Sequence, residues 1–278
     1  MQDIKKKFWL EKFDCFSVSG KDAKKFLNGI TTANILSAEN KVTKTCWLTP
    51  NGILRAIIEI ISLERCLEVI ILAGSKNEIV DYFNQIIFPA DDVLISEPFL
   101  ISRIQEISEI SSWRSCQPIF FKKNDEEFTM YKNKLHLLNS EDLKLWKVNQ
   151  AIPTLGNEIN GKNNPLELGL KDLIDFNKGC YLGQETMSKI NNVSSLKQEI
   201  RIWESFESNL NLEVEDKNLY TNSDKDISVG KITSSFKTDS QIKGLAMIKR
   251  KYLEEGSYFF SEIFGKIIIN KSVGSIFL

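Results

Sequence analysis

Apolar and polar residues follow short periodic runs from the beginning of the chain. Residues 14–36 begin with an apolar run typical of a short strand and continue through a turn into a helix-like repeat. Within the repeat, apolar residues recur at helical spacing from Ala23 to Ile30, and Asp22 just before them belongs to a residue type common at helix starts. We therefore predict a strand, a turn and a helix here.

The next runs add strands and another helix. Residues 46–61 and 66–74 are rich in Ile, Leu and Val, and the Pro50-Asn51-Gly52 turn inside the first run predicts a hairpin. Residues 75–95 carry an apolar stripe at helical spacing before Pro89. Helices that alternate with antiparallel strand pairs are typical of an α+β fold.

The second half of the chain changes character. We predict a strand over residues 99–107, a hairpin-like run over 126–138 and a helix over 140–152, followed by a loop over 153–169 rich in Gly, Asn and Pro. From residue 198 on, short strand-like runs separated by Gly, Asn, Asp and Ser indicate a small all-β barrel. The predicted domains are residues 1–197 and residues 198–278.

Composition narrows the classes of function. The chain has 278 residues, of which 42% are hydrophobic and 26% charged, and its formal net charge is -1. Such a balance gives no global basic field, so we expect no direct binding of nucleic acid. The apolar runs are short and interrupted by charges such as Arg55 and Glu59, which predicts no membrane span. No secretory signal is apparent at the N-terminus, so we expect a cytoplasmic protein.

The cysteines and the single histidine argue against a metal site and against catalysis by histidine. The chain has five cysteines, an odd number, widely scattered and without a C-x-x-C pair, which favours a reducing compartment and no metal site. His136 is the single histidine and lies in a short strand-like run, where a structural role is favoured. Chemistry that depends on histidine is therefore disfavoured.

The segment KGCYLGQE, residues 178–185, carries the candidate chemistry. Gly179 and Gly183 flank a cysteine, which suggests special backbone angles or the close approach of another group. A helix beginning near Gln184 would place its positive end close to Cys180, and Lys178 would add a positive charge; both favour the thiolate. A half-buried, inert cysteine in a tight turn is the alternative reading.

The rest of the segment offers groups that suit a heterocycle. Tyr181 has an aromatic face and a hydroxyl, and Gln184 and Glu185 have hydrogen-bond acceptors. A carboxylate that accepts two hydrogen bonds would suit a pterin, which carries adjacent amino and ring N–H groups. From the residues alone, Glu185 is more simply explained as a first-turn acid favoured by the helix dipole.

The segment also resembles the signature K-G-C-[YF]-x-G-Q-E of the YgfZ family, folate-dependent proteins that support iron–sulfur cluster assembly or repair. Residues 17–35, 48–56 and 146–170 resemble other parts of that family. Residues 229–236 and 243–252 resemble its C-terminal barrel, which is shared with the T-protein (aminomethyltransferase) of the glycine cleavage system. The resemblance implies a tetrahydrofolate-binding core of two α+β subdomains and a small C-terminal β-barrel.

Three positions depart from the family pattern. Val148 and Ala151 stand in or near the places where the family usually has an arginine and a glycine, and Lys189 lies in the stretch after the signature where an arginine and further glycines are common. These changes leave the signature intact and weaken the case for anion contacts from the helix that follows it.

The resemblance implies a tetrahydrofolate-binding accessory protein, not a conventional enzyme, with iron–sulfur client proteins or cluster assembly factors as partners. Cluster enzymes of tRNA modification are among the expected clients. Cys180 would be the functional thiol and Lys178 would tune it. The residues expected to contact the folate or hold the loop are Glu158, Gly179, Tyr181, Gly183, Gln184 and Glu185.

Two alternatives remain open at this point. A folate-dependent one-carbon transferase like T-protein would need an acid or base in its folate cavity, for which Asp91, Asp92 and Glu158 are candidates. A folate-independent scaffold would use KGCYLGQE as a turn and a helix cap.

Overall fold

A computed structural model describes most of the chain as two compact units. The first unit comprises Met1–Asn139 and Asp172–Thr186, and the second comprises Ser140–Lys171 and Met187–Leu278. The predicted boundary between residues 197 and 198 stays a prediction. The described residues are 6–37, 41–107, 112–122, 128–129, 132–133, 135–193, 196–206, 215–238 and 241–271.

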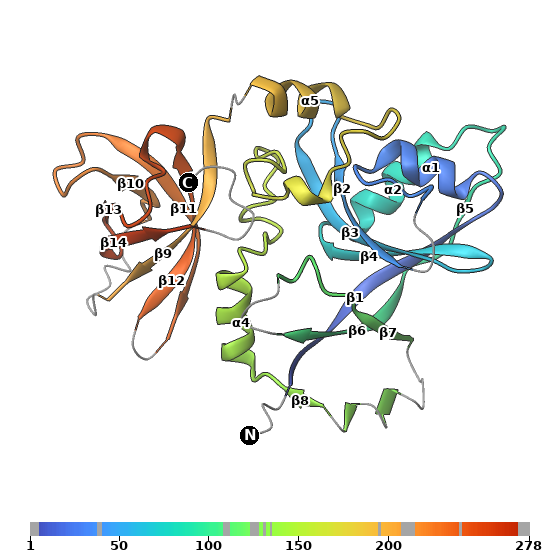
Figure 1. Ribbon diagram of the computed structural model, residues 1–278, viewed down its shortest axis with the longest axis horizontal. Coiled ribbons are helices and arrows are strands. Elements are labelled where there is room, and N and C mark those ends of the chain that lie inside the picture. Colours follow the sequence, from blue (N-terminus) through green and yellow to red (C-terminus); the bar gives the residue numbers. More distant parts are fainter. Residues whose placement is uncertain are drawn as a thin grey trace. The chain divides into compact units, whose positions relative to one another are not determined.

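The first unit is built on a mostly antiparallel sheet in the strand order β2-β3-β4-β1-β6-β7 (Figure 1). The short strands β5 and β8 both pair with β1, and β8, which contains the exposed His136, does so in parallel. Parts of the predicted run 126–138 lie outside the described residues. The strands are β1 (Lys7–Ser19), β2 (Val42–Leu48), β3 (Leu54–Ser62), β4 (Cys66–Ala73), β5 (Leu94–Ile95), β6 (Phe99–Ile107), β7 (Ile119–Lys122) and β8 (His136–Leu137).

The predicted hairpin joins β2 and β3. Its turn is closed by the Gly52 amide, which donates to the Thr49 carbonyl at 2.9 Å, and by the Thr49 amide, which donates to the Ile53 carbonyl at 2.9 Å. Gly52 adopts a positive φ of 76°, a conformation that glycine reaches without steric cost. The hairpin prediction is confirmed.

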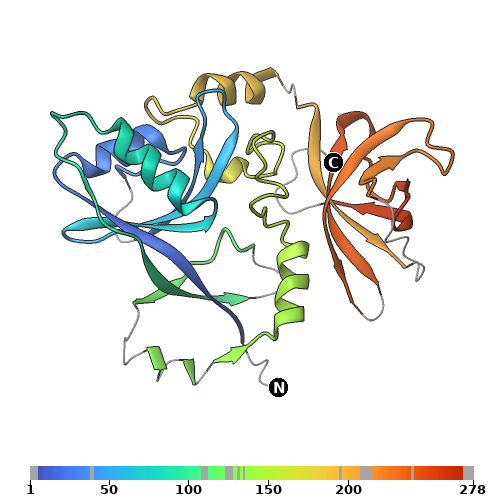
Figure 2. The same ribbon diagram turned by 180° about the vertical axis from the view of Figure 1, so that it is seen from behind.

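Two helices cover one face of this sheet. They are α1 (Ala23–Ile30) and α2 (Lys76–Ile86), which Figures 1 and 2 show beside strands β2 to β4. The apolar stripes of both helices pack on the strands, and Phe83 meets Trp47 edge-on with ring centroids 5.6 Å apart. Burying one such aromatic side chain contributes about 1.5–3 kcal/mol. The apolar stripes read from the sequence thus form the core of the first unit.

The second unit contains a helix, a long loop and a barrel. Helix α4 (Ser140–Asn149) precedes the loop, and the six barrel strands, which are labelled in Figure 1, close in the order β10-β11-β12-β9-β14-β13. Trp203 fills the barrel core, with its ring centroid 4.8 Å from that of Phe264. The strands are β9 (Gln198–Ser205), β10 (Asn218–Tyr220), β11 (Ser228–Lys237), β12 (Ile242–Lys249), β13 (Tyr258–Ser261) and β14 (Gly265–Asn270), with a 3-10 turn η2 (Arg250–Tyr252) after β12. The α+β fold with a small C-terminal barrel is confirmed.

Ala151 ends α4 in a left-handed backbone conformation. It is fully buried after α4 with a φ of 47°, in the left-handed region that costs residues with a Cβ about 1–2 kcal/mol. Its amide donates to the Val148 carbonyl at 2.9 Å, which closes the end of the helix. Glycine would occupy this position without that strain.

Candidate functional site

The KGCYLGQE segment bridges two short helical elements of the chain. It follows the 3-10 turn η1 (Lys171–Leu173) and runs into α5 (Gln184–Val193). Before the segment, the Asp175 amide donates to the Thr32 carbonyl at 2.9 Å, and the Thr32 hydroxyl donates to the Leu173 carbonyl at 2.7 Å. The approach to the segment is therefore bonded to the residues that follow α1.

Lys178 fixes the beginning of the segment. Its side chain is buried, and Nζ donates to the backbone carbonyls of Asn28 at 2.5 Å, Thr31 at 2.8 Å and Ala33 at 2.7 Å. These carbonyls lie in and just after the last turn of α1, where carbonyls lack intrahelical partners and a cation is favourable. Burial lowers the pKa of Lys178 to about 8, with Asp175 opposing the shift, and the three carbonyl acceptors favour the charged form.

Residues 181–183 fix the end of the segment. Tyr181 is buried with its ring centroid 5.3 Å from Lys178 Nζ, and the Leu182 amide donates to the Gly29 carbonyl at 3.0 Å. Gly183 has a φ of 84°, and a Cβ there would lie 2.8 Å from the Thr49 carbonyl oxygen in the β2–β3 turn. Gly183 therefore permits both the left-handed backbone and the close approach to the hairpin, as the sequence suggested.

Cys180 lies between these two fixed points and is exposed. Its neighbour Gly179 is also exposed, and a Cβ built there would meet no other atom within 4 Å. Gly179 is not among the glycines with positive φ, so the structure gives it no backbone requirement of its own. The thiol therefore stands at the exposed tip of a loop whose two flanks are buried.

The last two residues of the segment begin α5. The Gln184 amide donates to the Tyr181 carbonyl at 3.1 Å, and Glu185 is an exposed acid in the first helical turn. That position favours a carboxylate through the helix dipole. The helix start predicted near residues 183–184 is confirmed, while the folate contacts of both side chains stay predictions.

Threonine side chains that the sequence reading missed support the segment from beneath. The Thr32 hydroxyl accepts from the Cys46 amide at 2.9 Å and lies 3.1 Å from the Thr45 hydroxyl, which accepts from the Ala33 amide at 2.8 Å. All these groups are buried or half-buried, so the residues after α1, strand β2 and Leu173 before the segment share one hydrogen-bonded network. The two adjacent threonines after the α1 stripe were the available signal, since polar residues at a buried helix end need partners.

Burial also raises the pKa of two cysteine thiols and of the Tyr181 hydroxyl. It raises the pKa of the Cys46 thiol to about 12 and that of the Tyr181 hydroxyl to about 12, and it raises the pKa of the Cys15 thiol further still. Cys15 and Cys46 are fully buried neutral thiols, whereas Cys180 is the exposed one among five free cysteines.

Glu158 belongs to the second unit, in the loop that follows α4. It is fully buried, and its Oε2 accepts from the Thr154 amide at 3.0 Å and from the Thr154 hydroxyl at 2.9 Å. Its Oε1 is buried and has no hydrogen-bond partner among the described residues. A buried carboxylate oxygen left without a donor is costly, so this oxygen is a candidate acceptor for a ligand.

The other candidate acids hold a loop together. Asp92 Oδ2 accepts from the Lys21 amide at 3.2 Å, and the Asp92 amide donates to Asp22 Oδ2 at 3.0 Å. Asp91 Oδ2 accepts from the Phe88 amide at 3.4 Å. These contacts explain both acids as supports of the turn before α1 and of the loop after α2.

Two features are absent from the described part of the chain. No group of three or more His, Cys, Asp or Glu side chains comes together there as a metal site requires. Across the same residues, no helix is both long and apolar enough to cross a membrane.

The chain is similar to known proteins in sequence and in fold. No protein-family profile matches the chain. The chain is 28% identical to an uncharacterized protein of Haemophilus influenzae over 65% of this chain and 66% of that protein, and 26% identical to "Putative transferase At1g60990, chloroplastic" of Arabidopsis thaliana over 69% of this chain and 54% of that protein. It thus spans just under two thirds of the first relative and about half of the second.

The structural comparison covers nearly the whole chain. The crystal structure of glycine cleavage system aminomethyltransferase T from Bartonella henselae matches with a TM-score of 0.75 over 96% of this chain and 85% of that chain, at 10% sequence identity. This protein therefore has the aminomethyltransferase T fold.

Replacing Lys178 by Met tests the first fixed point. The variant keeps much of the side-chain length but leaves three carbonyls without their donor, so we expect its free energy of unfolding to fall by about 1–3 kcal/mol in urea denaturation. Lys189→Met, at an exposed position of α5, is the matched control and should change stability little. Equal effects of the two substitutions would contradict the anchoring role.

Replacing Tyr181 by Phe tests the buried hydroxyl through pH. Because the pKa of Tyr181 is raised to about 12 in the folded protein from an ordinary value of 10.0, the folded state keeps a proton that the unfolded state loses between these values. The free energy of unfolding of the wild type should therefore fall more steeply from pH 10 to pH 12 than that of Tyr181→Phe. Parallel stability curves for the two proteins over this window would show that the hydroxyl is not buried.

Proposed function

We propose that this protein binds a reduced folate, such as tetrahydrofolate, and supports the assembly or repair of iron–sulfur clusters in client proteins. Cluster enzymes that modify tRNA are among the proposed clients. The observation that carries the proposal is the placement of Cys180, an exposed thiol between two buried fixed points in a segment that resembles the YgfZ signature.

The thiol is suited to contact a partner. A cysteine that meets a cluster, a partner thiol or a client protein has to be exposed, and its loop loses little conformational freedom on binding when the flanks are already fixed. Lys178 and Gly183 supply that fixation on the two sides of Cys180. Cys15 and Cys46 lack the required exposure, because both are fully buried.

The folate part of the proposal is supported by unsatisfied polar atoms. A reduced folate supplies a planar heterocycle with adjacent amino and N–H donors, and it can carry a one-carbon unit. In the second unit, Glu158 Oε1 is a buried acceptor without a partner among the described residues, which fits such donors. In the first unit, the Tyr181 hydroxyl is likewise buried and without a partner within the described ranges.

The cysteines also bear on the compartment of the cell and on the partners. The five free thiols suit a reducing compartment, so we propose a cytoplasmic location. The proposed partners are iron–sulfur client proteins or cluster assembly factors.

A folate-dependent aminomethyltransferase is the second candidate function. It is favoured by the likeness to aminomethyltransferase T, with its TM-score of 0.75. Against it, the carboxylates of Asp91 and Asp92 bond to backbone amides and are accounted for as loop supports. Turnover of an aminomethyl-lipoyl carrier by the purified protein would reverse the order of the two candidates.

Two substitutions test the proposed folate site and the proposed role of the Cys180 thiol independently of each other. We expect tetrahydrofolate to raise the melting temperature of the wild type and of Cys180→Ala alike, because a ligand that binds the native state stabilises it. Glu158→Gln replaces a buried acceptor, so its affinity for tetrahydrofolate should fall about tenfold or more. The affinity is measured by calorimetric titration of the full chain.

The same variants are then compared in cells that lack the gene. Cys180→Ala should fail to restore the activity of an iron–sulfur enzyme of tRNA modification, while Cys116→Ala, a matched change at a half-buried cysteine, should restore it. Restoration by Cys180→Ala would remove the thiol from the proposal. Absence of any folate effect on the wild type would remove the folate.

A further inference from the structure

The sheet of the first unit carries a buried group of charged and polar side chains on the face opposite α1 and α2. It consists of Lys44, Glu59, Arg103 and Gln105, here termed the charge cluster, and all four are buried. Ile58 and Ile60 on either side of Glu59 pack into the core under the helices, so Glu59 points to the other face of β3. Lys44 lies directly opposite Glu59 in the pairing of β2 with β3.

Arg103 is the centre of the charge cluster. From β6 its guanidinium reaches Glu59 in a two-pronged ion pair, with Nε donating to Oε2 at 2.7 Å and Nη2 donating to Oε1 at 2.8 Å. Nη2 also donates to Gln105 Oε1 at 2.5 Å. The Trp9 ring lies over the guanidinium, with its centroid 4.4 Å from the central carbon. These contacts hold the guanidinium in one orientation.

Two donor groups in the charge cluster remain without partners. Arg103 Nη1 and Gln105 Nε2 are both buried and have no hydrogen-bond partner among the described residues. Each nitrogen carries two N–H groups, and the two side chains are joined through the Arg103–Gln105 hydrogen bond. Two nitrogens that lack an acceptor therefore lie on side chains in direct contact in the interior, where unmet donors are costly.

The charges within the charge cluster do not balance, while Glu68, another buried carboxylate of the sheet, is paired with Lys122 at 2.7 Å. Lys44 Nζ is 3.5 Å from Glu59 Oε1 and donates to the Cys116 carbonyl at 2.7 Å, so two cations share one buried carboxylate. Burial lowers the pKa of Lys44 and the nearby Glu59 opposes the shift, so an added negative charge would act in the same direction as Glu59. Glu11 on the neighbouring strand is only partly buried and accepts from Trp9 Nε1 at 2.7 Å.

We propose that the charge cluster binds a small planar carboxylate anion, of which formate is the simplest, at Arg103 Nη1 and Gln105 Nε2. A carboxylate can accept one N–H from each of the two nitrogens with its two oxygens, brings no protons that need acceptors and offsets the positive charge of the cluster. A buried water accepts only two hydrogen bonds and adds two donors of its own to a group that already lacks acceptors. The site is independent of the proposed folate and of Cys180.

The test uses ¹³C-labelled formate and the full chain at constant ionic strength with sodium chloride. Wild type should show a bound formate resonance and a melting temperature that rises with formate and saturates. In Gln105→Glu, the new carboxylate takes the place of the anion beside Arg103. This variant should bind no formate and, without formate, should melt above the wild type.

Gln85→Glu makes the same change of charge at an exposed position of α2 and should bind formate as the wild type does. Gln105→Met keeps the approximate volume and removes the Nε2 donors, so its dissociation constant for formate should rise about tenfold or more, which tests the site even if Gln105→Glu fails to fold. A wild type without bound formate would assign the donors to water and overturn the proposal. Equal binding by the wild type and Gln105→Met would overturn it as well.

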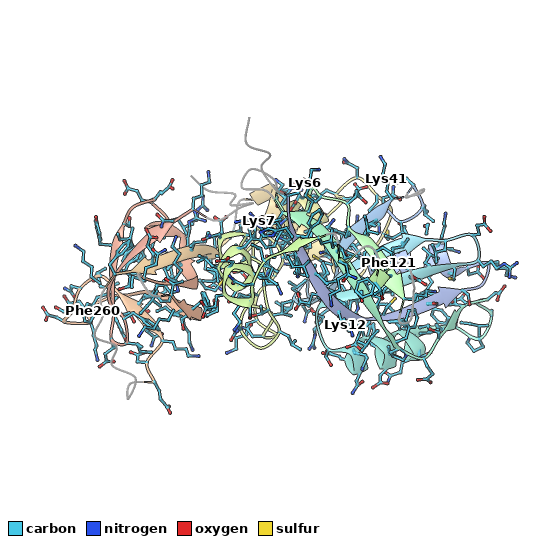
Figure 3. All side chains as sticks on the ribbon, turned by 90° about the horizontal axis from the view of Figure 1, so that it is seen from below. Lys6, Lys7, Lys12, Lys41, Phe121 and Phe260 are labelled. Carbon is cyan, nitrogen blue, oxygen red and sulfur yellow. The ribbon has the colours of Figure 1, made fainter. Side chains whose placement is uncertain are left out.

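The sheet that carries the charge cluster can be followed in Figure 3, where Lys12 of β1 and Phe121 of β7 are labelled. Arg103 lies in β6, the strand between β1 and β7 in the sheet order.

Discussion

The contact between the Lys178 ammonium and the end of α1 is the interaction on which the candidate site depends. Helix α1 ends with carbonyls that have no intrahelical partners, and one ammonium satisfies three carbonyls in and after its last turn. The same contact fixes the residue two positions before Cys180. These three hydrogen bonds explain why a lysine stands at position 178, independently of any effect on the thiol.

The structure explains a glycine at only one of the two glycine positions of the segment. Gly183 has a left-handed backbone and lies so close to the Thr49 carbonyl that a Cβ would clash. Gly179 meets neither condition and leaves the space beside Cys180 open. Gly183 thus docks the loop on the β2–β3 hairpin, while neither packing nor backbone angle requires a glycine at position 179. Lys178 and Gly183 together fix the loop on both sides of the exposed cysteine.

Much of the fold could be predicted because it rests on local patterns. The stripe from Ala23 to Ile30, the Pro50-Asn51-Gly52 turn and the short runs after residue 198 each encode their element within a few residues. The partners of Lys178 could not be predicted, since they are backbone carbonyls 145 to 150 residues earlier in the chain. Arg103 and Glu59 likewise meet across two intervening strands, which only the sheet order reveals.

Relative reactivity of the five cysteines tests the account most directly. When the native protein is treated with iodoacetamide and digested at successive times, mass spectrometry of each cysteine peptide gives its rate of alkylation. The account predicts that Cys180 is modified well before Cys66 and Cys116, and that Cys15 and Cys46 react only after unfolding. Protection of Cys180 in the native protein, or alkylation of Cys46 at the same rate as Cys180, would contradict the exposed, anchored thiol.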